Sequence, residues 1–212
     1  VATGATVFEP VGMYEYGKNE NVITQLQLER LLKDGKLKKP EKVVMIQCVG
    51  SREEKGRTYC SRVCCMTALK NALLIRELYP ESEVYLLYRD LQSYGQRYEH
   101  HHREAQEKDI KFIRYLQEKP PEVATGKDGK LEVNIHHALL DEPIKVESDL
   151  VVLATPLIQH EDAKELSKML KVPIGSDGFF FEAHVKLRPV DFATDGIFVC
   201  GTAHSPKDTA ES

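Results

Sequence analysis

Four of the five cysteines in this 212-residue chain are close together in the sequence, and their thiols are the side chains best suited to chemistry. They are Cys48, Cys60, Cys64 and Cys65. Cys48 ends an apolar run of strand type, and the other three fall in the next loop and the first turn of the helix expected after it. These two places meet at the carboxyl edge of a parallel sheet, so the four thiols can converge. Four convergent thiolates are the ligand set of an iron–sulfur cluster or of tetrahedral zinc.

Three interpretations of these cysteines are open from the residues alone. An iron–sulfur cluster is favoured, because the amino end of a helix supplies free N–H groups and partial positive charge that stabilise thiolates and sulfides. Structural zinc usually takes cysteines two to four residues apart, which a long first gap followed by adjacent cysteines fits poorly. Redox-active thiols without a metal are the third alternative. Cys200 stands alone in an expected short strand and is interpreted as a packing residue.

The elements that must position the thiols alternate between strands and helices. Short apolar runs predict strands at residues 42–47, 83–88 and 110–115, and helical spacing predicts helices at 66–78 and 98–108. This alternation is typical of a parallel sheet with right-handed crossovers.

The pattern changes after residue 120. Alternating residues 131–136 and 144–146 predict an antiparallel meander, with a hairpin turn at Asp128 and Gly129. Residues 149–156 predict a buried strand that returns to the parallel sheet. Further on, we expect a short amphipathic helix at 163–170 and a short strand at 196–201.

The loop after the first expected strand lacks the Gly-x-Gly-x-x-Gly spacing of a dinucleotide site. Residues 48–52 (CVGSR) stand there instead, and a longer loop leads on to Cys60. Asp90 follows the second strand, where a ribose-binding acid would lie, and is interpreted as a helix cap. We therefore expect a Rossmann-like domain whose phosphate-binding loop has been replaced by cysteines.

Composition argues against several classes of protein. Acidic residues outnumber basic ones by 33 to 29, which gives a net charge of −4, so nucleic acid is not an expected partner. Apolar runs are too short to cross a bilayer, and no signal peptide is recognised. The expected location is the cytoplasm, either free or at the periphery of a membrane complex.

Several motifs resemble known families. Residues 2–5 (ATGA) and 153–156 (LATP) resemble the crossovers between the FAD and pyridine-nucleotide domains of disulfide-reductase flavoproteins, and residues 194–202 (TDGIFVCGT) are similar to their late FAD motif. Other motifs resemble the A-type subunit of heterodisulfide reductase: residues 15–17 (EYG), 46–52 (IQCVGSR), 59–65 (YCSRVCC), 87–90 (LYRD) and 204–208 (HSPKD).

The resemblance implies an α/β fold of the pyridine-nucleotide-disulfide-reductase NAD-domain type. This fold has a Rossmann-like parallel sheet, an antiparallel three-stranded meander and, here, partial FAD-domain flanks. The implied divisions are residues 1–39 (FAD lobe and crossover), 40–156 (Rossmann-like domain with the cysteines) and 157–212 (FAD lobe). The chain is accordingly expected to be an internal piece of a longer protein.

The implied function is that of an electron-transfer segment in a flavin- and iron–sulfur-dependent oxidoreductase. A [4Fe–4S] cluster on the four cysteines would relay electrons between FAD and partner proteins. The expected partners are other heterodisulfide-reductase-like subunits and electron-donor and electron-acceptor proteins. The isolated segment is expected to be inactive. The alternatives are a zinc-stabilised docking domain and an NAD(P)-binding oxidoreductase domain.

Five further residues are assigned to the flavin. The resemblance implies that Gly4, Gly201, Thr202 and Lys207 contact FAD in the intact chain. Lys70, a turn and a half beyond the last clustered cysteine, is assigned a catalytic role, because a cation there would stabilise an anionic reduced flavin.

Overall fold

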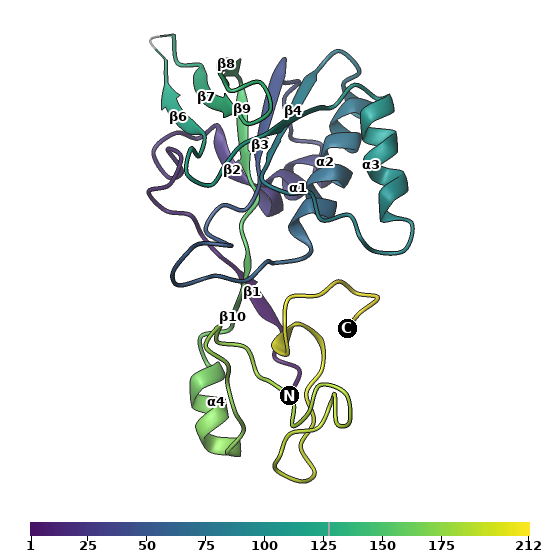
Figure 1. Ribbon diagram of the computed structural model, residues 1–212. Coiled ribbons are helices and arrows are strands. Elements are labelled where there is room, and N and C mark those ends of the chain that lie inside the picture. Colours follow the sequence, from purple (N-terminus) through teal and green to yellow (C-terminus); the bar gives the residue numbers. More distant parts are fainter. Residues whose placement is uncertain (127) are drawn as a thin grey trace. The chain divides into compact units, whose positions relative to one another are not determined.

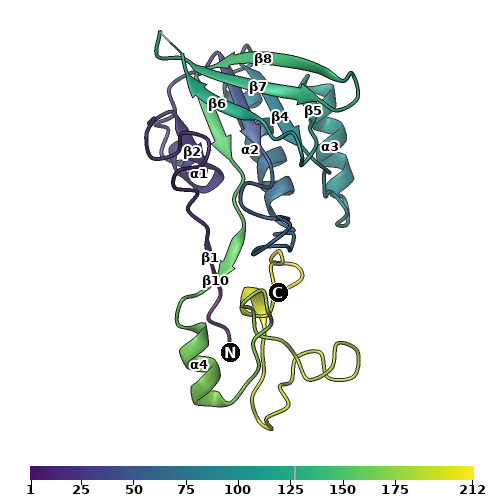
Figure 2. The ribbon, with the colours of Figure 1, turned by 60° about the vertical axis from the view of Figure 1, so that its left-hand side comes forward.

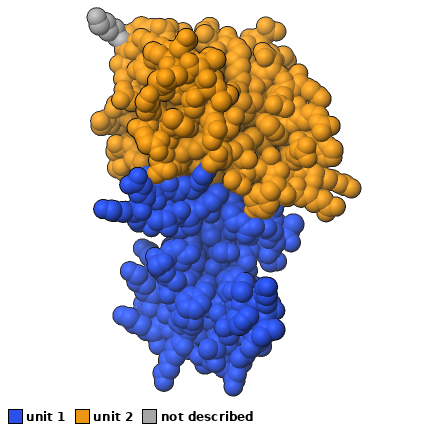
Figure 3. All heavy atoms as spheres, in the orientation of Figure 1, with its two compact units in different colours: residues 1–8, 50–63, 156–212 blue, residues 9–49, 64–155 orange. Residues whose placement is uncertain are grey.

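The computed structural model describes residues 1–126 and 128–212, and the chain divides into two compact units (Figure 3). Unit 1 comprises Val1–Phe8, Gly50–Val63 and Pro156–Ser212, and unit 2 comprises Glu9–Val49 and Cys64–Thr155. These units differ from the predicted divisions, because residues 9–39 lie in the same unit as the parallel sheet and the loop at 50–63 lies in the other. That the flanking segments belong to an FAD lobe remains a prediction.

A five-stranded parallel sheet forms the centre of unit 2 (Figure 1). Its spatial order is β2 (Val22–Thr24), β9 (Leu150–Leu153), β3 (Lys42–Ile46), β4 (Glu83–Tyr88) and β5 (Lys111–Arg114). The central strand β3 pairs with β4 on one side and with β9 on the other, parallel in both cases. The predicted parallel sheet is confirmed.

Three helices cover one face of this sheet: α1 (Gln25–Lys33), α2 (Cys64–Leu78) and α3 (Tyr98–Glu107) (Figure 1). Successive side chains of a strand point to opposite faces. Val43 and Met45 of β3 therefore share a core with Leu69 and Ala72 of α2. The helix predicted at 66–78 is confirmed and begins two residues earlier, at Cys64.

An antiparallel three-stranded sheet covers the other face (Figure 2). It consists of β6 (Glu122–Thr125), β7 (Leu131–His137) and β8 (Glu142–Ser148), in that order. Val44 and Ile46 of β3 pack with Leu131 and Val133 of β7. Helices, parallel sheet and meander therefore make the three layers that the predicted fold class requires.

Helix α1 was not predicted, although the sequence carries a local signal for it. Thr24 caps the helix: its hydroxyl accepts from the Gln27 backbone N–H at 3.3 Å, and the Gln27 side chain accepts from the Thr24 N–H at 2.7 Å. This reciprocal arrangement is a capping box, which the order Thr-x-x-Gln encodes.

Unit 1 has little regular structure. An antiparallel pair, β1 (Ala5–Val7) with β10 (Leu157–Gln159), is followed by α4 (Ala163–Leu170), which matches the predicted helix. The strand predicted at 196–201 is wrong. Phe198 makes an isolated bridge to Asp191 and accepts a hydrogen bond from the Val1 amino group, and the chain then forms a 3₁₀ turn at Gly201–Ala203. Positive φ angles at Gly196 (+80°) and Gly201 (+64°) end the extended conformation on both sides.

Among the helices of the described residues, none is long and apolar enough to cross a membrane.

Candidate functional site

Cys48 lies at the point where the central strand of unit 2 ends. The two neighbours of β3 lie on opposite sides of it, and open α/β sheets bind ligands at such a switch point, outside the carboxyl ends of the strands. Cys48 is buried and has φ +61°, a left-handed conformation that costs a residue with a side chain roughly 1–3 kcal/mol. The next residue, Val49, donates its N–H to Ala154 O at 3.0 Å. The strained turn thus brings the chain across the carboxyl end of β9.

Cys64 and Cys65 are the first two residues of α2. This helix connects β3 to the parallel strand β4, so its amino end lies at the same edge of the sheet as the end of β3. Both side chains are buried. The first N–H groups of a helix have no intrahelical acceptor and carry partial positive charge, which favours the thiolate form.

Cys60 belongs to unit 1, where hydrogen bonds connect Tyr59 and Ser61, on either side of it, to β10. The Tyr59 hydroxyl donates to Leu157 O at 2.9 Å, and the Leu157 N–H donates to Ser61 Oγ at 2.8 Å. Cys60 is half-buried, and its Sγ accepts from the Arg62 N–H at 3.3 Å. The loop that carries Cys60 is therefore held by hydrogen bonds within unit 1.

Among the described residues, His, Cys, Asp and Glu side chains form no group of three or more that could hold a metal ion. The predicted ligand set therefore rests on the chemistry of the donors and on their positions in the fold. Thiolates are the ligands of iron–sulfur clusters, and three of the four lie at the edge of unit 2 where this class of fold binds ligands.

The loop that follows Cys48 requires glycine at one position. Gly50 has φ +76°, and a Cβ at this position would lie 2.6 Å from Cε1 of Phe8. The guanidinium of Arg57 covers the Phe8 ring at 3.8 Å, and its Nε donates to Gly50 O at 2.6 Å. Tyr59 packs edge-on against Phe179 at 5.5 Å, and burial raises the pKa of this tyrosine.

Gln47, immediately before Cys48, was not anticipated as a functional residue. It is fully buried, and both of its backbone groups are bonded: the N–H donates to Leu87 O at 2.9 Å, and the carbonyl accepts from the Tyr115 hydroxyl at 2.7 Å. Its side-chain Nε2 and Oε1, in contrast, have no hydrogen-bond partner among the described residues. A glutamine at the end of an apolar run was the only signal of this in the sequence.

The four residues assigned as FAD contacts, Gly4, Gly201, Thr202 and Lys207, lie in unit 1. A Cβ built on Gly4 would be 3.8 Å from Thr202 Oγ1, and Gly201 precedes Thr202 in the 3₁₀ turn. The Lys207 ammonium lies 3.0 Å from Nδ1 of His204, whose backbone N–H donates to Gly201 O. Their flavin contacts remain predictions.

A hydrogen bond between Glu182 and His204 was also not anticipated. Glu182 Oε2 lies 2.6 Å from His204 Nε2. A hydrogen bond from its own backbone N–H, together with His204, lowers the pKa of Glu182. No short-range pattern joins residues this far apart in the sequence.

Lys70 lies on α2, and its ammonium is ion-paired with Glu29 of α1 at the surface of unit 2. Its catalytic role remains a prediction.

Two other interpretations from the sequence are wrong. Asp90 does not cap α3, whose N-cap is Arg97. The packing role of Cys200 is contradicted by its exposure.

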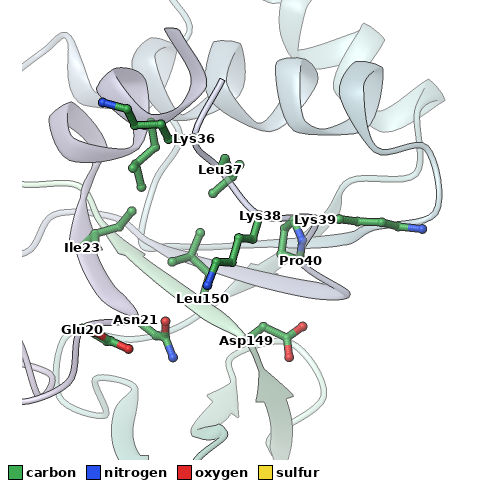
Figure 4. A pocket seen from close by; sticks show the side chains of 11 residues that line it. Glu20, Asn21, Ile23, Lys36, Leu37, Lys38, Lys39, Pro40, Asp149 and Leu150 are labelled. Atoms are coloured by element: carbon green, nitrogen blue, oxygen red, sulfur yellow. The ribbon is translucent and has the colours of Figure 1, made fainter. Parts of the chain in front are cut away.

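A pocket of about 420 Å³ lies at the opposite, amino-terminal edge of the sheet (Figure 4). Ile23, Leu37 and Leu150 contribute apolar walls, and Lys38, Glu20 and Asp149 are among the charged residues that line it. Because it lies at the starts of the strands, this pocket is separate from the edge that carries the cysteines of unit 2.

Comparison with solved structures identifies the class of fold. The chain aligns over 97% of its length with T. acidophilum thioredoxin reductase (TM-score 0.57, 16% identity) and over 98% with the Lactococcus lactis enzyme (TM-score 0.61, 19% identity), covering 57% of each. The protein thus has the fold of the pyridine-nucleotide–disulfide oxidoreductases, as expected. No family model matches the sequence.

Sequence comparison then identifies particular relatives. The chain is 42% identical over its full length to the A-type subunit of the H(2):CoB-CoM heterodisulfide,ferredoxin reductase of Methanothermobacter marburgensis, of which it covers 34%. It is 44% identical over 94% of its length to the A-type iron–sulfur subunit of the CoB--CoM heterodisulfide reductase of Methanocaldococcus jannaschii, covering 32%. A protein of Archaeoglobus profundus that is named as similar to this type of subunit is 36% identical over the full length of the chain, which covers 34% of it.

The chain is therefore related to the A-type subunit of heterodisulfide reductase and corresponds to one segment of it. It spans about a third of the length of the curated relatives that it matches.

Proposed function

We propose that this chain is the electron-transfer segment of a flavin- and iron–sulfur-dependent oxidoreductase of the heterodisulfide reductase type. One observation carries the proposal: Cys48 in a strained conformation at the switch point, with Cys64 and Cys65 opening the next helix. A dinucleotide-binding domain would place glycines and phosphates there. The Methanocaldococcus jannaschii relative, which is named an iron–sulfur subunit, supports the same assignment.

The proposed cluster ligands are Cys48, Cys60, Cys64 and Cys65. A bound [4Fe–4S] cluster supplies one-electron transfer at a potential set by net charge, solvent exposure and hydrogen bonds to its sulfurs. The chain contributes burial of three of these thiols and the N–H groups at the start of α2. Burial excludes water and limits loss of the metal through oxidation.

The second proposed cofactor is FAD, bound in the intact protein with contacts from Gly4, Gly201, Thr202 and Lys207. The thioredoxin reductase fold and the resemblance of residues 194–202 support this assignment. Lys70 is proposed to stabilise the anionic reduced flavin once its ion pair with Glu29 opens. The proposed partners are other subunits of a heterodisulfide reductase complex and electron-carrier proteins, since one relative is named a ferredoxin reductase.

The test uses the full-length protein, purified without oxygen. Iron and zinc content, the visible spectrum and electron paramagnetic resonance after reduction are compared for the parent, Cys64→Ser and Cys200→Ser. We expect a brown, iron-containing parent, loss of one cluster signal in Cys64→Ser, and unchanged iron content and cluster signals in the exposed control Cys200→Ser. If Cys64→Ser kept every cluster signal and its flavin were reduced as in the parent, the electron-relay proposal would be wrong.

Two other outcomes would favour the alternatives. A colourless protein with one zinc that is lost in Cys64→Ser would indicate a zinc-stabilised docking domain. Saturable binding of NADH to the isolated chain would indicate an NAD(P)-binding domain, despite a loop without the required glycines.

A further inference from the structure

The side-chain amide of Gln47 is an unusual buried polar group of unit 2. It is fully buried, and neither Nε2 nor Oε1 has a hydrogen-bond partner within residues 1–126 and 128–212. Leaving a buried amide unpaired costs on the order of 1–3 kcal/mol, and such groups in native proteins usually have a water, an ion or a catalytic role to explain them. The backbone gives no explanation, because both main-chain groups of Gln47 are bonded.

The position of Gln47 on the sheet indicates which face its side chain occupies. The bond from its N–H to Leu87 O continues the ladder between β3 and β4 by one residue. Val43 and Met45, four and two residues earlier, both point into the core beneath the helices. The same alternation assigns the Gln47 side chain to the helical face, at the edge where α2 begins with Cys64 and Cys65.

We infer that the Gln47 side-chain amide donates a hydrogen bond to an anionic sulfur of the cluster proposed above, either the Cys48 thiolate or a bridging sulfide. This inference rests on the proposed function. An amide N–H₂ group carries two donors, and a hydrogen bond to an anionic acceptor in a dry site is stronger than one between neutral groups. Gln47 would then be a positioning and tuning residue, which does not itself ligate iron.

The direction of the effect follows from charge. Reduction adds one negative charge to the cluster, and a donor aimed at its sulfur stabilises that extra charge more than it stabilises the oxidised form. The Gln47 amide therefore raises the reduction potential of this cluster. Without iron, the same amide is a buried group without a partner and lowers the stability of unit 2.

Three variants of the full-length protein test the inference. Gln47→Met keeps the length of the side chain and removes its polar atoms, and Gln47→Glu replaces the donor with a carboxyl group. Ser148→Ala is the matched control, because the Ser148 hydroxyl is also buried without a partner in the described part of the chain, but it lies on β8 in the meander layer.

We expect both Gln47 variants to keep their iron, while the ratio of reduced to oxidised cluster at a fixed solution potential falls by about fivefold. An exchangeable-proton coupling, measured by electron–nuclear double resonance in H₂O and D₂O, should disappear in Gln47→Met. Ser148→Ala should match the parent in both measurements. After removal of iron, Gln47→Met should unfold at a urea concentration equal to or above that of the parent.

The outcomes separate this inference from the function on which it rests. If the parent holds its cluster and both Gln47 variants keep the parent's potential and proton coupling, the inference is wrong and the proposed function stands. If the parent contains no iron–sulfur cluster on these cysteines, both are overturned. If Ser148→Ala shifts the potential as much as Gln47→Met does, general loosening of unit 2 explains the effect and the inference is also wrong.

Discussion

The hydroxyl of Tyr115 donates to the backbone carbonyl of Gln47 at 2.7 Å, and both residues are buried. Tyr115 follows β5 and Gln47 follows β3, while β4 lies between these two strands in the sheet. A single side chain thus reaches past β4 and fixes the backbone immediately before the strained Cys48. The carboxyl edge of unit 2 is therefore stabilised by a bond between residues far apart in the sequence.

Removal of this bond should loosen the edge of the sheet. We expect Tyr115→Phe to lower the free energy of unfolding by about 1–3 kcal/mol, because the Gln47 carbonyl would remain buried without this donor. Urea denaturation measures the loss, and hydrogen exchange at the amides of Gln47 and Val49 localises it. Tyr94→Phe, an exposed control in the same unit, should change stability by less than about 0.5 kcal/mol. Equal effects of the two variants would contradict this account.

The side-chain carboxyl group of Glu83 should have an unusually low pKa. Lys111 and Tyr85 both bond its Oε2, at 2.8 and 2.6 Å, and these hydrogen bonds lower the pKa of Glu83 from 4.5 to about 2. Because the folded-state pKa is below the unfolded value, the network stabilises the protein above pH 4.5 and the contribution is lost as the pH falls toward 2. The carboxylate is partly exposed, so the contribution is below about 1 kcal/mol.

Nuclear magnetic resonance titration of the Glu83 carboxyl carbon measures the pKa of Glu83. Lys111→Met should raise the pKa of Glu83 toward 4.5, because the largest cause of the depression is removed. Lys108→Met, which removes the partner of Glu104 instead, should leave Glu83 unchanged. An unshifted Glu83 in Lys111→Met would show that the bond is not formed in solution.

Two buried amides should hold α1 against α2. The Asn71 side-chain N–H donates to Gln25 Oε1 at 2.8 Å, and Gln25 in turn lies 3.6 Å from the Met45 sulfur. Gln25→Met or Asn71→Leu alone should cost about 1–3 kcal/mol, since each leaves the other amide without its partner. The double variant should cost less than the sum of the two, with a coupling energy of about 1–2 kcal/mol from denaturation. Strict additivity would mean that the two side chains do not interact.

The loop after Cys48 should tolerate a methyl group at one glycine better than at another. Gly50 and Gly56 both have positive φ, but only at Gly50 would a Cβ strike a neighbour, the ring of Phe8 at 2.6 Å. Gly56→Ala should cost about 1 kcal/mol through backbone strain alone. Gly50→Ala should cost about 1–3 kcal/mol more, and Phe8→Leu should recover part of the difference. Thermal unfolding compares the variants, and equal costs at the two positions would contradict the contact with Phe8.

Much of the fold could be predicted because apolar residues recur at regular spacing along its longer helices and strands. Residues 83–88 and 163–170 were predicted with the bounds that the structure has, and β7 differs by one residue. The three-residue strands β1, β2 and β10 were missed, because three residues are too few to show an alternation. The apolar run at 196–201 was predicted to be a strand, but in the described part of the chain it makes one isolated bridge, to Asp191, and hydrogen bonds with Val1, without a continuous ladder.

The sequence by itself determined the order of strands and helices and the place of Cys48, Cys64 and Cys65 at strand and helix ends, because periodicity and chain order are local properties. Only the tertiary structure decided that Cys48 adopts a left-handed backbone, that the Gln47 amide is buried without a partner among the described residues, and that Glu182 meets His204. Burial and hydrogen bonding depend on which distant segments pack together, and no short stretch of sequence specifies that packing.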